Sequence, residues 1–142
     1  MLARRELSEL QVRQRLARKG HDPGAIDDAV ARLLEQRAID DARVAEAIAR
    51  TETTVRKRGK VRVRMQIERA GIAKGTAKRA TDDVFDGIDD DALIDAALAK
   101  RLRGRDTVAD DREFQRLYRY LVSQGFESDR ALKALHLRKR AR

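Results

Sequence analysis

Apolar side chains recur along most of this sequence at intervals of three and four residues, a spacing that predicts amphipathic helices. Residues typical of helix starts precede these stripes. Ser8 and Gln11 have the spacing of a capping box, and Asp22 stands before Pro23 as an N-cap stands before a first-turn proline. The pattern predicts an all-α fold with three helices between residues 8 and 57. Five further helices are predicted at about residues 60–70, 74–86, 91–103, 110–124 and 128–138.

One segment gives a conflicting pattern. Between residues 60 and 67 apolar and polar positions alternate strictly, which by period alone is typical of a β-strand. An internal comparison of the sequence aligns residues 61–67 of this segment with residues 10–16, which lie in a stretch with clear helix caps. We therefore predict a helix here as well.

The same comparison shows that the chain is built from repeats. Gly20, Gly71 and Gly125 each follow an aliphatic residue by four positions, and they lie 51 and 54 residues apart. A second internal similarity links residues 39–50 with residues 88–100. Two internal similarities with nearly the same period predict tandem three-helix units. The predicted units are residues 1–58, residues 59–104 with a basic first helix, and a partial third unit of two helices in residues 105–142.

Composition indicates an extended arrangement of these units. The 142 residues include 22 alanines but only three Phe, two Tyr and no Trp. Alanine buries little surface, so we expect a thin core and an elongated, curved array rather than a globule. The absence of cysteine excludes disulfides and thiolate metal sites, and no apolar run is long enough to span a bilayer. We expect a cytoplasmic protein.

The net charge of +9 is concentrated in one segment. Residues 1–49 and residues 80–142 each sum to zero, whereas residues 50–79 carry eleven basic and two acidic side chains. A concentrated positive field attracts a polyanion or an acidic protein groove. The predicted contact residues for a protein or nucleic-acid partner are Arg50, Arg56, Lys57, Arg58, Lys60, Arg62, Arg64 and Arg69.

Candidate catalytic chemistry is sparse. The two histidines, His21 and His136, have no neighbouring nucleophile or acid that would form a triad, and no glycine-rich phosphate loop is present. The acidic run in residues 82–91 departs from the EF-hand pattern and is explained by a helix end followed by an N-cap. We expect a binding protein with no catalytic residues, no metal and no cofactor.

The repeats contain a set of segments in one order and spacing: residues 8–20, 40–45, 58–72 and 115–121, together with Gly125 and Phe126. Through this set the sequence resembles the RecX family of recombination regulators over nearly its whole length. Val44 stands where family members usually carry an aromatic residue. The resemblance implies an elongated array of three-helix modules. We expect the protein to be a monomer that regulates DNA repair and recombination. Such proteins bind the groove of the RecA–single-stranded DNA filament and modulate, mostly by inhibition, its ATPase, strand-exchange and co-protease activities.

Two other functions fit the residue pattern. Short helices joined by tight turns also occur in helix-turn-helix proteins, so the chain could bind single- or double-stranded DNA by itself. It could also be a repeat adaptor for another acidic partner.

Overall fold

The structure is a computed structural model that describes residues 6–139 of the chain. These residues form an all-α fold, and no β-strand occurs among them. The helices are α1 (Glu9–Arg18), α2 (Pro23–Glu35), α3 (Asp41–Thr54), α4 (Lys60–Arg69), α5 (Lys74–Phe85), α6 (Asp90–Leu102), α7 (Asp111–Ser123) and α8 (Ser128–Leu137). None of the helices in this part of the chain is long and apolar enough to cross a membrane.

Local sequence features explain most helix ends. The Ser8 side chain accepts a hydrogen bond from the Gln11 N–H and completes the predicted capping box at α1. Asp22 caps α2 ahead of Pro23, also as predicted. The alternating segment is helical, because α4 spans it. The third helix ends at Thr54, three residues earlier than predicted, and Lys57 in the following turn has a left-handed backbone with φ of +57°.

The helices pack in three groups that differ from the predicted unit boundaries. The structure pairs α1 with α2, packs α3 on both α4 and α5, and packs α6 on both α7 and α8. We call these groups the first, middle and third modules. The boundaries predicted at residues 58 and 104 instead join α3 to the first unit and α6 to the second. A repeat period fixes the spacing of equivalent helices but leaves open which three consecutive helices form one core.

Each module has its own apolar core. Ile26, Val30 and Ile39 form a small cluster in the first module. The middle module is centred on Val63 and Ile67, both fully buried, and its core also includes Val44 and many alanines. The third module is centred on larger side chains, which include Ile94, Leu98, Leu121 and Leu135.

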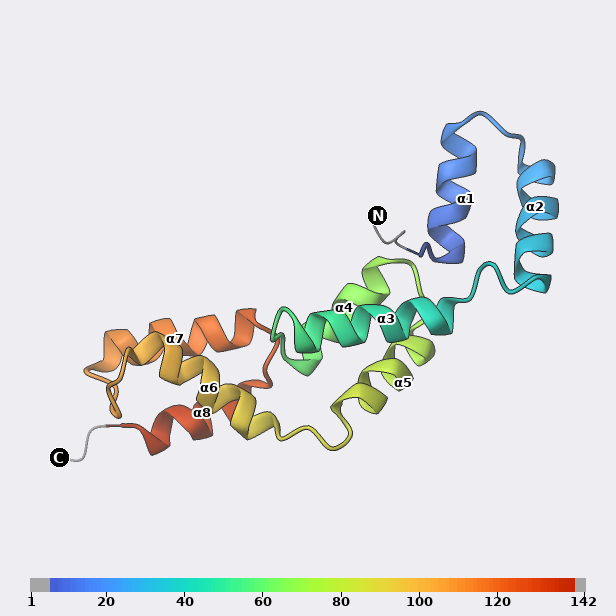
Figure 1. The fold of residues 1–142 in the computed structure, drawn as a ribbon. Helices are drawn as coiled ribbons and strands as arrows, with labels where there is room; N and C mark the ends of the chain where they lie inside the picture. The colour runs from blue at the N-terminus through green and yellow to red at the C-terminus, as the bar shows by residue number, and fades with distance from the viewer. Residues whose placement is uncertain (1–5, 140–142) are drawn as a thin grey trace.

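The modules follow one another in an elongated, curved row (Figure 1). The middle module lies between α1–α2 at one end and α6–α8 at the other. The chain exposes 10120 Å² of surface. A compact monomer of 16.1 kDa exposes about 7,400 Å². The excess surface follows from dividing the core among small modules.

Equivalent helix ends form the two joints between modules. At the first joint, the start of α1 meets the end of α4: the Ser8 hydroxyl donates to the Ala70 carbonyl, and Leu10 packs on Gly71. At the second joint, the start of α4 meets the end of α7. The Gly59 N–H donates to the Gln124 carbonyl at 2.8 Å, and the Val61 N–H donates to the Gly125 carbonyl at 2.9 Å. Gly71 and Gly125, two of the three repeated glycines, therefore lie where modules touch, whereas a Cβ at Gly20 would meet no atom within 4 Å.

Candidate partner-binding surface

The eight predicted contact residues lie on the middle module or at its joint with the third module. Arg50 is on α3, and the loop between α3 and α4 carries Arg56, Lys57 and Arg58. The other four, Lys60, Arg62, Arg64 and Arg69, are on α4. The structure divides the eight into three sets according to what their side chains contact.

Arg58 and Arg62 contact the third module. The Arg58 Nη1 atom donates to Gln124 Oε1 at 2.9 Å, and the Arg62 Nη1 atom donates to the Ser123 carbonyl at 2.9 Å. The acceptors lie at the C-terminal end of α7, where free carbonyls and the helix dipole favour a cation. Both arginines thus help to hold the second joint together.

Four other cations pair with acids of the middle module. Arg50 pairs with Glu46, and Arg56 lies 3.6 Å from Glu52. Lys60 lies 2.9 Å from Asp82, which also binds Lys78 at 2.7 Å. Hydrogen bonds from Lys78 and Lys60 lower the pKa of Asp82 to about 2. The Arg50 and Lys60 pairs lie at the surface and contribute about 0–1 kcal/mol each to stability, so a stronger partner can replace them, whereas Glu52 is buried.

Arg64 is the fourth cation that pairs with an acid of the middle module. It lies 3.5 Å from Glu68, on the same helix α4. Lys57 and Arg69 form the last set. Both are exposed, and within residues 6–139 neither makes an ion pair.

Two apolar side chains of α4 are exposed among these cations. Val61 is 49% and Met65 is 42% exposed. With Arg69 they follow one another at four-residue spacing, so the three lie along one line of the helix surface. We call Val61, Arg64, Met65 and Arg69 the α4 patch. The structure buries Val63 and Ile67 and leaves Val61 in solvent.

A groove between α3 and α5 adds a second feature to the middle module. It has a volume of about 610 Å³ and carries Arg50 and Arg79 beside Glu46 and Asp83. Its charges balance, so it lacks the positive excess expected of a phosphate site. The net positive character of the middle module therefore lies mainly around α4 and the preceding loop.

The fold and this surface define an all-α helical-repeat array, a class of protein in which stacked modules present one extended face. The family model described as "RecX, first three-helix domain" matches residues 1–33. The match covers α1 and most of α2.

Sequence comparison extends the similarity to nearly the whole chain. The chain is 35% identical to Regulatory protein RecX of Halorhodospira halophila over 130 residues, which cover 91% of this chain and 78% of that protein. It is 31% identical to Regulatory protein RecX of Chromohalobacter salexigens, over 95% of this chain and 86% of that protein. The crystal structure of RecX from Lactobacillus salivarius superimposes with a TM-score of 0.70 at 18% identity, over 92% of this chain and 86% of that one. The chain belongs to the RecX family of regulatory proteins.

Proposed function

We propose that this chain regulates homologous recombination and DNA repair by binding in the groove of a RecA–single-stranded DNA filament. Binding lowers the ATPase, strand-exchange and co-protease activities of the filament. The chain does this as a cytoplasmic binding protein, through contacts alone. Membership of a family whose members are named regulatory proteins supports a regulatory role.

The extended shape supports a polymeric target. A row of three modules reaches further than a compact domain of equal mass, and each module can contact a different subunit of a filament (Figure 1). A globular target would engage only part of such a surface.

The α4 patch is the observation that carries the proposal. It combines exposed Val61 and Met65 with Arg64 and Arg69, and this mixture of apolar centre and charged rim is typical of protein interfaces. A surface that bound only phosphates would need the cations but not the apolar pair. Lys57, Arg56 and Arg50 extend the cationic part of the contact along the middle module.

The experiment is a titration of the protein into a RecA ATPase assay on single-stranded DNA. The test variant is Arg64→Gln/Arg69→Gln. The control is Arg32→Gln/Lys133→Gln, which removes the same charge from exposed positions of α2 and α8. We expect wild type and control to inhibit at equal concentrations. The test variant should require about thirtyfold more protein, since loss of interface arginines costs about 2 kcal/mol and every 1.4 kcal/mol is a factor of ten.

Equal inhibition by all three proteins would remove the α4 patch from the interface. Absence of inhibition by the wild-type protein, at concentrations that saturate the filament, would overturn the proposed function.

A further inference from the structure

A second basic site lies in the third module, away from the α4 patch. It is a pocket of about 560 Å³ between the C-terminal end of α6 and one side of α7. Its walls carry five basic side chains and one acidic side chain: Lys100, Arg101, Arg103, Arg105, Arg116 and Glu113. Residues 80–142 sum to zero, but four of these basic side chains lie within residues 100–105, and folding brings Arg116 beside them.

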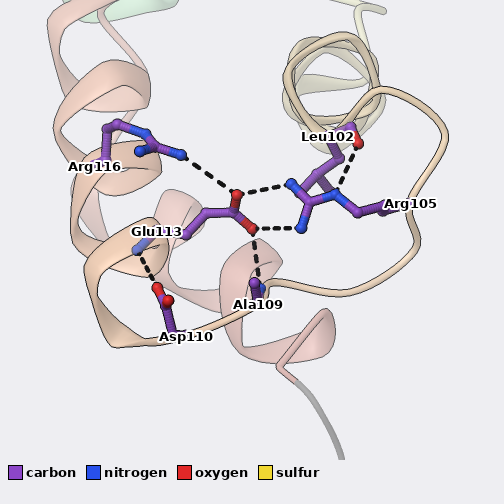
Figure 2. Close-up of polar contacts among 6 residues, drawn as sticks. All are labelled: Leu102, Arg105, Ala109, Asp110, Glu113 and Arg116. Atoms are coloured by element: carbon purple, nitrogen blue, oxygen red, sulfur yellow. Dashed lines mark hydrogen bonds and ion pairs between the residues drawn. The ribbon is translucent and has the colours of Figure 1, made fainter.

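The single acid of the pocket is already neutralised. Arg105 holds Glu113 with both terminal nitrogens, at 2.7 and 3.0 Å, and Arg116 lies 3.3 Å from the same carboxylate (Figure 2). The Ala109 N–H donates to it at 2.9 Å. The hydrogen bonds from Arg105 and Ala109 lower the pKa of Glu113 to about 2, so the carboxylate stays ionised and paired at neutral pH.

This network also fixes the loop between α6 and α7. The Arg105 Nε atom donates to the Leu102 carbonyl at 3.2 Å, so one guanidinium ties the end of α6 to the start of α7 (Figure 2). Arg105 and Glu113 are therefore positioning residues. Among the described residues, Lys100, Arg101 and Arg103 form no ion pair, and all three are exposed. They remain available to a ligand.

A cation–π contact lines the same pocket. The Arg101 guanidinium carbon lies 3.8 Å from the centre of the Tyr120 ring. The ring holds the guanidinium plane in place, and Arg101 is exposed. Bases of single-stranded nucleic acids stack on guanidinium planes and on aromatic rings, while nearby Lys and Arg side chains bind the phosphates.

Further arginines continue this surface along α7. Arg112, Arg116 and Arg119 are exposed and lie four and three residues apart, so they share one side of the helix. A chain of phosphates can follow such a row beyond the pocket. An acidic peptide would also be attracted by the charge, but it carries no planar group that needs the Arg101–Tyr120 stack.

We propose that the pocket between α6 and α7 binds a single-stranded nucleic acid, with one base stacked on Arg101 and the adjoining phosphates held by Lys100 and Arg103. The site lies in the third module and needs no contact with the α4 patch. It gives the protein a direct contact with the strand in addition to a contact with a protein partner.

The test measures binding of fluorescein-labelled oligothymidylate by fluorescence anisotropy as a function of salt, with no recombinase present. Lys100→Gln/Arg103→Gln should bind at least about tenfold more weakly and lower the salt slope by about 1.4, which corresponds to two lost phosphate contacts on a single strand. Arg101→Lys keeps the charge but removes the plane. It should weaken binding several-fold and leave the salt slope unchanged. Arg32→Gln/Lys133→Gln is the matched control and should retain the wild-type slope.

Equal losses in the pocket variant and the control would show that only net charge matters and would overturn the proposal. So would unaltered binding by Arg101→Lys, or tighter binding of polyglutamate than of oligothymidylate. Circular dichroism of each variant verifies that the helices are retained. Because the assay contains no filament, failure of this site leaves the ATPase test of the α4 patch unaffected.

Discussion

Gly59 and Gly125 lie backbone to backbone at the joint between the middle and third modules. A Cβ atom at Gly59 would overlap the carbonyl carbon of Gly125 and lie 2.5 Å from the Phe126 nitrogen. Gly125 also has φ of +100°, a left-handed conformation that favours glycine. This close approach lets the first N–H groups of α4 reach the carbonyls at the end of α7. Two glycines that are 66 residues apart thus set the distance between two modules.

The first prediction concerns this contact. Gly59→Ala should destabilise the protein by about 1–3 kcal/mol, because the added methyl group overlaps backbone that cannot move without opening the joint. Gly75→Ala is the control: it lies in α5, its Cβ would meet no atom within 4 Å, and alanine there should be neutral or stabilising by up to about 1 kcal/mol. Urea unfolding followed by circular dichroism measures both. Equal stability of the two variants would contradict the tight joint.

The second prediction separates arginines that hold the joint from arginines that face solvent. Arg62→Gln removes a hydrogen bond to the Ser123 carbonyl and should lower the unfolding free energy by about 1 kcal/mol. Arg69→Gln, on the same helix, should change it by less than about 0.5 kcal/mol, since Arg69 is exposed. Thermal melts at equal ionic strength provide the comparison. If the two variants melt alike, Arg62 is as free for a partner as Arg69.

The third prediction is a pH dependence at Glu113. Its pKa in the folded protein is about 2, below its ordinary value of 4.5, because Arg105 and the Ala109 N–H stabilise the charged form. A lowered pKa contributes stability that is present above about pH 4.5 and is lost as the pH falls toward about 2. The melting temperature of Glu113→Gln should therefore be lower than that of wild type at neutral pH, and the difference should shrink on acidification.

Asp106→Asn is the control for this pH dependence, since it makes the same change of carboxylate to amide in the loop before α7. Its melting curve should follow the wild type over the whole range. A constant difference between Glu113→Gln and wild type, down to about pH 2, would show that the Arg105–Glu113 pair does not depend on the charge of the carboxylate.

The helices were predictable because the features that begin and end them are local. Ser8, Asp22 and Pro23 act within one turn of chain, and the structure retains all three roles. The grouping of helices into modules was not predictable in the same way. The glycine period gives equivalent points in successive units, and two of the three, Gly71 and Gly125, lie at joints rather than in the interiors of units.

The candidate sites show a similar division. The charge excess of residues 50–79 pointed to the middle module, but the acceptors of Arg58 and Arg62 lie 66 and 61 residues away and could not be identified from sequence. The basic pocket of the third module was missed because residues 80–142 are neutral as a whole, although four basic residues lie within residues 100–105. In the folded protein, Asp91 pairs with Arg130 and Asp95 pairs with Arg138. These two acids of α6 therefore do not neutralise the basic residues at the end of the helix, Lys100, Arg101 and Arg103.

The last prediction concerns the apolar half of the α4 patch. Val61→Thr/Met65→Gln should change the unfolding free energy by less than about 1 kcal/mol, because close to half of each side chain is in solvent. The same variant should inhibit the recombinase ATPase about tenfold more weakly, since apolar side chains at the centre of an interface contribute more to affinity than charges at its rim. Leu34→Gln/Leu137→Gln removes exposed apolar side chains from α2 and α8 and is the control. Equal inhibition by both variants would mean that the filament is bound through charge alone, and the α4 patch would then be reduced to its two arginines.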